Sequence, residues 1–127
     1  MTIRNEKAYM NNLWDWGFIE NILPGSCAVS DIDGIIERRG HFQLIETKGP
    51  GVEVPQGQAI MFDSLSAIPQ FSVWVVWGKP GKVEAMQRWG QAVFRADNQN
   101  LLDTVQLWWE LADNTPRPPR APYTVGG

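Results

Sequence analysis

Three side chains suited to phosphodiester chemistry, Asp33, Glu46 and Lys48, fall on or beside two neighbouring apolar runs of the sequence. Carboxylates are ligands that Mg²⁺ accepts, usually together with the phosphate oxygens of a substrate. Lys48 follows Glu46 after one residue, and its ammonium group could stabilise charge on a phosphate or orient a water. The pattern predicts a site that holds a divalent metal against a phosphodiester.

The two apolar runs have the composition of β-strands joined by a tight turn. Residues 32–37 and 42–48 are rich in branched and aromatic side chains, and the polar segment between them contains Gly40. If the loop is Arg39-Gly40 alone, paired residue numbers sum to 79. Asp33 then faces Glu46, and Asp31 faces Lys48. A three-residue loop with a bulge would shift this pairing by one residue.

Two carboxylates that face each other across a strand pair repel, because their Cβ atoms are only about 4.5–5.5 Å apart. In the register above, side-chain alternation places Asp33, Glu46 and Lys48 on one face. A hard cation between the carboxylates would offset the repulsion. Asp31 could pair with Lys48, assist the metal or lie on the surface, and these alternatives stay open.

Composition indicates one ordinary soluble domain. The chain has 127 residues, of which 43% are hydrophobic, and a net charge of -3. An acidic chain does not by itself indicate nucleic-acid binding, so any such surface must be local. The single Cys27 excludes an internal disulfide framework and fits a reducing cytoplasm. We expect neither a secretory signal nor a membrane span, and therefore a cytoplasmic protein.

The rest of the chain predicts helices and strands that place these residues. Gln58 falls on the apolar face of a helix that follows Pro55. The expected helices are residues 6–16, with a short extension at 18–23, then 56–67 and 98–112. The expected strands after the hairpin are 71–77, which reads as a central strand, then 83–88 and a short one at 92–94. Residues 114–127, rich in Pro and Gly, predict an extended tail.

These elements indicate an α/β fold, with a mixed central β-sheet flanked by helices. The expected organisation is a single domain over residues 1–113, followed by the tail at 114–127. No internal repeat and no domain linker is visible in the sequence.

On these residues, the chain resembles the PD-(D/E)XK nuclease superfamily, the restriction-endonuclease-like fold. The resemblance covers about Glu6 to Trp77 and is carried by Asp33, the Glu46-Thr47-Lys48 string and the helical Gln58. The string from Asp31 to Arg38, together with Gln56-Gly57-Gln58, looks like small bacteriophage members. The resemblance implies a core of αβββαβ type. The proline that gives the family its name is replaced here by Ile32.

The resemblance also implies roles for individual residues. Asp33 and Glu46 would be metal ligands, with the backbone carbonyl of Thr47 as a third. Lys48 would be the catalytic lysine, and Gln58 would lie near the scissile phosphate or the metal. A glutamate of the first helix would complete the outer shell, with Glu20 as the nearest candidate and Glu6 as the reserve. The implied cofactor is Mg²⁺, for which Mn²⁺ would substitute.

The expected function is that of a metal-dependent deoxyribonuclease, encoded by a bacteriophage and acting in the host cytoplasm. A chain this short has little room for a sequence-recognition domain, which favours branched DNA or DNA ends as substrate. Expected partners are DNA, a second copy of the chain in a homodimer, and a phage or host replication or recombination protein. One alternative is a non-catalytic nucleic-acid-binding or protein-interaction module on the same fold, and another is RNA as the substrate.

Basic side chains are candidates for contacts with DNA phosphates, and ordinary solvated charge is the alternative for each. Arg38 and Arg39 lie at the expected hairpin tip, and Lys79 and Lys82 flank the turn after the central strand. Arg88 and Arg95, later in the chain, belong to the same set of candidates. Two further candidates, Arg117 and Arg120, belong to the expected tail, where they could form a basic arm.

Overall fold

The computed structural model of the protein describes residues 13–25 and 27–120. The chain divides into two compact units, Met1–Asp31 and Ile32–Gly127. The candidate residues from Asp33 onward all belong to the second unit, while Glu20 belongs to the first. Among the helices in the described ranges, none is long and apolar enough to cross a membrane.

The N-terminal unit contains one short helix, α2 (Gly17–Glu20), in its described part. A helix over residues 6–16 was expected, and of these residues 6–12 lie outside the described ones. The prediction is wrong for residues 13–16, which are not helical. Asp15 Oδ1 accepts a hydrogen bond from the Gly17 N–H at 2.8 Å. Aspartate commonly bonds the backbone two residues on in this way, which competes with a continuing helix.

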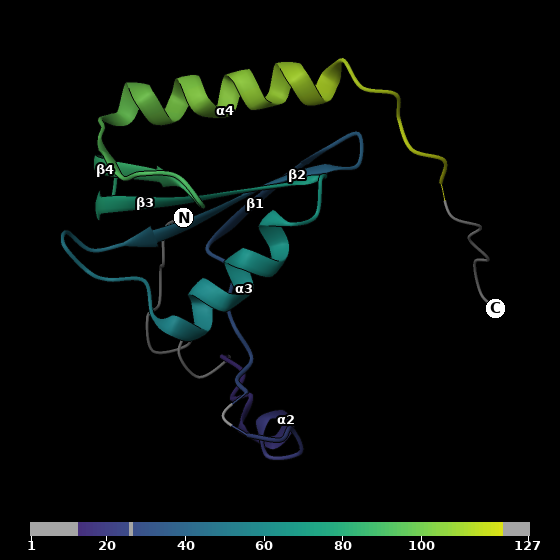
Figure 1. Cartoon of the computed structure of the whole chain (residues 1–127), viewed down its shortest axis with the longest axis vertical. Helices are drawn as coiled ribbons and strands as arrows, with labels where there is room; N and C mark the ends of the chain where they lie inside the picture. Colours follow the sequence, from purple (N-terminus) through teal and green to yellow (C-terminus); the bar gives the residue numbers. More distant parts are fainter. Residues whose placement is uncertain (1–12, 26, 121–127) are drawn as a thin grey trace. The chain divides into compact units, whose positions relative to one another are not determined.

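The second unit contains a sheet with one helix on each face (Figure 1). Within its described part, five strands pair in the order β1-β2-β3-β4-β5. Only β2 and β3 are parallel, so the sheet is mixed as expected. The elements are β1 (Gly34–Arg38), β2 (His41–Lys48), α3 (Gln56–Ser66), β3 (Phe71–Lys79), β4 (Lys82–Arg88), β5 (Phe94–Arg95) and α4 (Asn98–Asp113).

The hairpin has the two-residue loop that the sequence predicts. Gly34 pairs with Ile45 and Arg38 with His41, so paired residue numbers sum to 79. Arg39 and Gly40 both have positive φ, 51° and 80°. Positive φ at both central residues is the signature of a type I′ turn, whose twist matches that of the flanking strands. The expected register is therefore confirmed from the Gly34–Ile45 pair to the Arg38–His41 pair, whereas position 33 precedes β1 and is not among the paired residues.

Helix α3 crosses from β2 to β3 and packs on one face of the sheet. Leu44, Phe62, Val73 and Val75 form the buried core between them. Because strand side chains alternate, Glu46 and Lys48 lie on the same face of β2 as Leu44. Glu46 and Lys48 of the candidate site therefore lie at the edge of this core.

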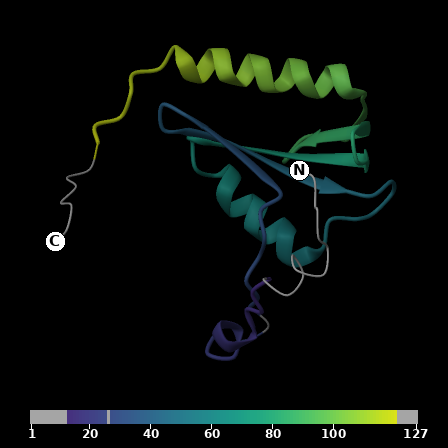
Figure 2. The ribbon, with the colours of Figure 1, turned by 180° about the vertical axis from the view of Figure 1, so that it is seen from behind.

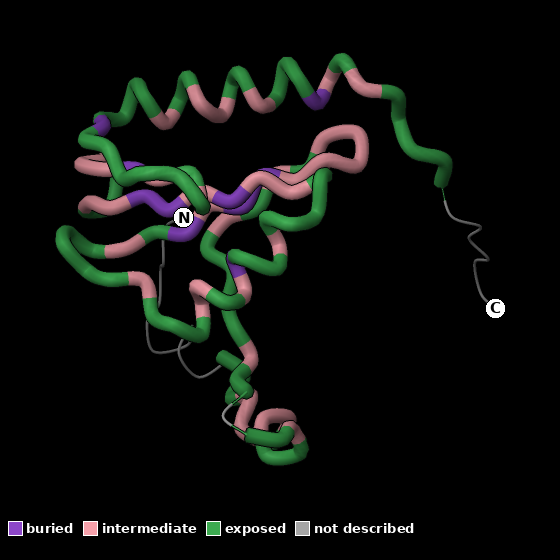
Figure 3. The backbone as a smooth tube through the Cα atoms, viewed as in Figure 1, coloured by how far each residue is buried: buried purple, intermediate pink, exposed green. Residues whose placement is uncertain are grey.

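Helix α4 packs on the opposite face of the sheet, as both ribbon views show (Figures 1 and 2). Val76, Met86 and Ala96 are the buried residues of that layer. Asp97 caps the start of α4 through a capping box with Asn100, which satisfies backbone N–H groups that the first turn leaves free. The burial pattern shows the two core layers, with the buried positions concentrated in the sheet and the outer side of α4 exposed (Figure 3).

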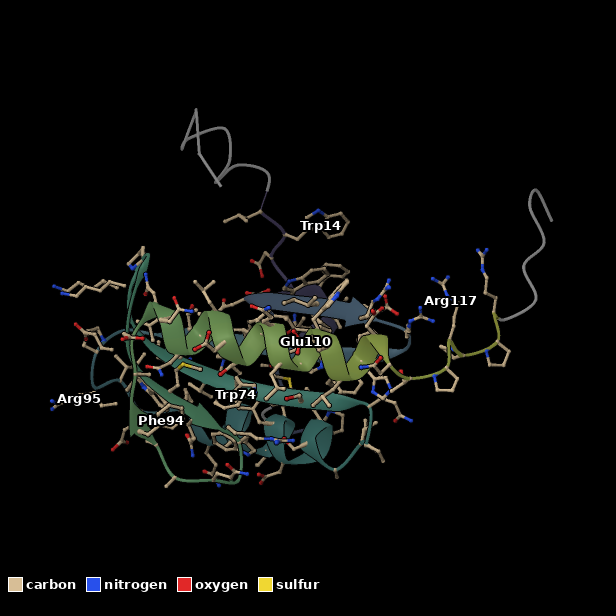
Figure 4. The ribbon with its side chains drawn as sticks, turned by 90° about the horizontal axis from the view of Figure 1, so that it is seen from above. Trp14, Trp74, Phe94, Arg95, Glu110 and Arg117 are labelled. Atoms are coloured by element: carbon tan, nitrogen blue, oxygen red, sulfur yellow. The ribbon has the colours of Figure 1, made fainter. Side chains whose placement is uncertain are left out.

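Several expectations about the remaining elements are met, and others need correction. β3 is the middle strand and is covered on both faces, as expected for the run 71–77. The short strand lies at Phe94–Arg95 rather than 92–94, where Phe94 meets Trp74 edge-on with ring centroids 6.3 Å apart (Figure 4). Two strands precede α3 in the described residues, so a core of αβββαβ type is not confirmed. Residues 116–120 of the expected tail are irregular.

Candidate active site

Glu46 is the buried acid of the candidate site. It lies near the end of β2 and is 5% exposed, although its neighbours on that face are apolar core residues. Its Oε1 accepts a hydrogen bond from Gln58 Nε2 at 3.0 Å and lies 3.3 Å from Lys48 Nζ. The structure therefore brings together Glu46, Lys48 and Gln58, as the sequence predicted for these three.

Gln58 reaches Glu46 because the connection from β2 to α3 is held in place. Pro55 occupies the N-cap position of α3 with extended backbone, and its carbonyl accepts the Ala59 N–H at 2.9 Å. The Trp77 indole N–H donates to the Val52 carbonyl at 2.6 Å, which ties the loop to β3. Gln58 therefore enters the layer between helix and sheet one turn into α3.

Two acceptor oxygens at this point are buried without a hydrogen-bond partner among the described residues. They are Glu46 Oε2 and Gln58 Oε1, one on each side of the Gln58–Glu46 bond. Buried polar atoms are nearly always satisfied, and a buried carboxylate needs compensating positive charge. The donor set, a carboxylate and an amide oxygen, matches what a hard cation such as Mg²⁺ binds. These residues therefore fit part of the predicted metal site.

Lys48 compensates the charge of Glu46 from the same strand face. The two side chains are 14% and 6% exposed, so the pair is largely removed from water. A largely buried pair is costly to desolvate, and removing either partner leaves an uncompensated charge. A buried ion pair often stabilises a core no better than apolar side chains of similar size would. This favours a chemical role for Glu46 and Lys48.

Asp33 lies just before β1, and its carboxylate bonds to Thr47. Oδ2 accepts the Thr47 backbone N–H at 2.9 Å and the Thr47 hydroxyl at 3.0 Å. No hydrogen bond joins the Asp33 carboxylate to Glu46, Lys48 or Gln58, all of which are described. The expected opposition of Asp33 to Glu46 is not seen. The Asp33 carboxylate instead bonds Thr47, whose side chain lies on the other face of β2 from Glu46, and this pair of bonds is termed the clasp of Asp33 on Thr47.

The described residues do not contain a ready-made multi-acid metal centre. No group of three or more His, Cys, Asp or Glu side chains in them gathers so that it could hold a metal ion. The expected outer-shell ligand Glu20 belongs to the N-terminal unit, where its Oε2 accepts the Val29 N–H at 2.9 Å. Its reserve, Glu6, lies outside the described residues. The roles of Glu20 and of the Thr47 carbonyl as ligands remain predictions.

Lys79 and Lys82 line a cavity of about 620 Å³ at the end of β2, and Thr47 and Lys48 also line it. Its remaining wall is mainly apolar and comes from β3, β4 and the start of α4, with Val76, Val83, Leu101 and Leu102 as contributors. The cavity therefore lies on the α4 face of the sheet, and Glu46, Gln58 and Asp33 do not line it. Two of the expected phosphate contacts are near the end of β2.

Arg38 and Arg39 lie at the other end of β2, at the hairpin tip, and both contact Asp113 at the end of α4. Arg38 Nε donates to Asp113 Oδ1 at 2.8 Å, and Arg39 Nε does so at 3.4 Å. The hydrogen bond from Arg38 lowers the pKa of Asp113 below its usual value, with a smaller contribution from Arg39. Sequence reasoning missed this acid, because no local pattern links it to a hairpin 75 residues earlier.

Comparisons of the full chain with protein-family models, with curated proteins and with solved structures give no match.

Proposed function

We propose that this protein is a divalent-metal-dependent nuclease that hydrolyses DNA phosphodiester bonds. The observation that carries the proposal is the buried Glu46, whose Oε1 contacts Gln58 and Lys48 while its Oε2 has no partner among the described residues. Burying a carboxylate and a lysine beside an amide costs free energy of desolvation on folding. A role in folding alone therefore explains these three residues poorly. The resemblance to the PD-(D/E)XK pattern supports the same reading.

The residues that would hold the metal are Glu46, Asp33 and the Thr47 carbonyl. Bound Mg²⁺, or Mn²⁺ in its place, would supply Lewis acidity to a phosphoryl oxygen and lower the pKa of an attacking water. Both Thr47 bonds fall on Oδ2 of Asp33, which leaves Oδ1 without a protein partner among the described residues. Asp33 can therefore keep its clasp on Thr47 and still offer an oxygen.

Lys48 has the position of a phosphate-stabilising group. Its Nζ lies 3.3 Å from Glu46 Oε1, so both are within reach of one substrate oxygen or one water. An ammonium group held in a largely buried place interacts more strongly with a developing negative charge than one in bulk water. Gln58 fixes the orientation of the Glu46 carboxylate through its amide N–H.

For the substrate we propose DNA recognised by shape, such as branches or ends, by a phage-encoded enzyme in the host cytoplasm. The cavity beside Thr47 and Lys48 carries Lys79 and Lys82, which suit contacts to phosphates next to the cleaved bond. A homodimer would supply two sites for cutting two strands. Exposed apolar side chains of α4, including Leu107, Trp109 and Leu111, are its expected interface.

A second candidate function is a non-catalytic nucleic-acid-binding or protein-interaction module on the same fold. The bond between Asp33 and Thr47 favours it, because a carboxylate used to join β1 to β2 has a structural role that needs no metal. Calorimetric titration with Mn²⁺ distinguishes the two candidates. The nuclease predicts binding that Asp33→Ala weakens, whereas the module predicts no binding or binding that this substitution leaves unchanged.

Cleavage of a substrate panel tests the proposal. The protein is incubated with Mg²⁺ or Mn²⁺ and labelled single-stranded, duplex, supercoiled, forked and four-way branched DNA, with RNA as a further arm. Lys48→Ala is run beside it, with folding matched by circular dichroism. Metal-dependent cutting that the variant loses supports the nuclease, and the most rapidly cut form identifies the preferred shape. Failure of the folded protein to cut any DNA or RNA would overturn it.

A further inference from the structure

Four arginines line a second cavity, between the hairpin tip and the segment after α4. The cavity has a volume of about 490 Å³, and Arg38, Arg39, Arg117 and Arg120 all lie on it. Figure 4 shows Arg117 beyond the end of α4, whereas Arg95 lies at the opposite end of that helix. This cavity is separate from the one that Lys79 and Lys82 line.

The charge of this cavity is opposite to that of the chain as a whole, which is -3. Glu37 also lines the cavity, and Asp113 pairs with Arg38 and Arg39. Counting these two acids against the four arginines leaves an excess of two positive charges. Glu37 Oε2 is already used by the turn, where it accepts the Gly40 N–H at 2.9 Å. This excess of positive charge makes the cavity a candidate binding site for an anion.

Much of the cavity wall is held in position by contacts within the protein. Arg38 is fixed by Asp113 and lies over the Trp109 ring, with its guanidinium carbon 4.8 Å from the ring centroid. Pro118 packs so closely on Gly40 that a Cβ built on that glycine would lie 2.7 Å from Pro118 Cγ. The contact brings the segment that carries Arg117 and Arg120 to the hairpin tip, where both line the cavity. Preorganised guanidinium groups bind phosphate well, because their planar fork matches two phosphate oxygens.

We propose that this cavity binds the phosphodiester backbone of the DNA substrate, away from the bond that is cleaved. The inference rests on the proposed nuclease function. Strand β2 leads directly from His41 at the hairpin tip to Glu46, a distance of about 17 Å at roughly 3.4 Å per residue. That length corresponds to about five base-pair steps of 3.4 Å along one strand. β1 is the edge strand beside β2, and one duplex that lies along this edge of the sheet would span both ends of β2.

The test compares two double variants of the full chain that lower the net charge by the same two units. Arg117→Ala with Arg120→Ala alters the cavity, and Gln91→Glu with Gln99→Glu is the control. All four side chains are exposed, and the control pair does not line the cavity. Binding of a fluorescein-labelled 20-base-pair duplex is measured by anisotropy without divalent metal, over a range of salt concentrations. Polyglutamate serves as the competing anion.

We expect the cavity variant to bind DNA about tenfold more weakly and to lose about one to two units of salt slope, since each released phosphate contact contributes about 0.9. The control should stay within about twofold of the unaltered protein. If the unaltered protein cleaves DNA and both variants bind it equally, the cavity proposal alone is overturned. If the unaltered protein neither binds nor cleaves DNA, the nuclease proposal is overturned, and the cavity proposal that rests on it is overturned as well. Tighter binding of polyglutamate than of DNA would also overturn the cavity assignment.

Discussion

Gln58 Nε2 donates a hydrogen bond to Glu46 Oε1 at 3.0 Å and so joins α3 to β2 through a polar contact beside an apolar core. The bond orients the one carboxylate that is buried in the described part of the chain. The bond therefore couples the position of α3 to the orientation of the Glu46 carboxylate.

Replacing Gln58 by leucine should destabilise the protein by about 1–3 kcal/mol, because the buried Glu46 loses a donor and gains no substitute. The free energy of unfolding in urea at pH 7 measures the effect. Gln56→Leu is the matched control, since Gln56 is exposed on the same helix and should change stability by no more than about 0.5 kcal/mol. Equal stability of the two variants would contradict a structural contribution from the Gln58–Glu46 bond.

Asp33→Asn separates the two roles of Asp33. The asparagine oxygen can still accept the Thr47 N–H, so we expect a loss of stability of about 1 kcal/mol or less. The negative charge is gone, so metal-dependent cleavage should fall by about 100-fold or more. Urea unfolding and cleavage rates at a fixed Mn²⁺ concentration measure the two effects. A variant that cleaves as fast as the unaltered protein would restrict Asp33 to the clasp on Thr47.

Gly40→Ala should destabilise the hairpin tip by about 1–2 kcal/mol. Gly40 has φ 80°, a conformation that costs an L-residue free energy, and the new methyl group would meet Pro118. Gly57→Ala is the control, because a Cβ there meets nothing within 4 Å and alanine favours a helix. Thermal unfolding of both variants tests this. An equally stable Gly40→Ala protein would mean that the turn differs from the one described.

Acid should remove the contribution of Asp113 to stability. Its pKa is lowered in the folded protein by the Arg38 hydrogen bond, so the contribution is present above the unfolded pKa and is lost as pH falls through the folded one. The stability difference between the unaltered protein and Asp113→Asn should therefore be constant from about pH 7 to 5. It should shrink below about pH 4. Urea unfolding at several pH values measures it, and a difference as large at pH 3 as at pH 7 would contradict the assignment.

Local patterns in the sequence predicted most of the second unit. Alternation and the Arg39-Gly40 turn determine the hairpin register, and helical spacing after Pro55 places Gln58 on the inner face of α3. Both signals are local, because a turn or a helix stripe is encoded within a few residues. The same reasoning failed for residues 13–16, where the Asp15 side chain competes for the backbone.

Contacts between distant parts of the chain could not be predicted in this way. Asp113 meets Arg38 only because α4 packs over the hairpin, and Pro118 meets Gly40 for the same reason. The clasp of Asp33 on Thr47 depends on where β1 begins, a boundary that a strand pattern leaves uncertain by a residue or two. The direction of a side chain at a strand end is set by the partner it finds there.

The rate of DNA cleavage with Mn²⁺, compared among the unaltered protein, Glu46→Gln and Glu110→Gln, tests the central claim most directly. Glu110 is exposed on α4, and its substitution removes the same charge outside the site (Figure 4). The nuclease proposal predicts metal-dependent cleavage that falls by about 100-fold or more in Glu46→Gln and is unchanged in Glu110→Gln. Folded protein that cleaves no DNA form, or that cleaves equally well without the Glu46 carboxylate, would contradict it.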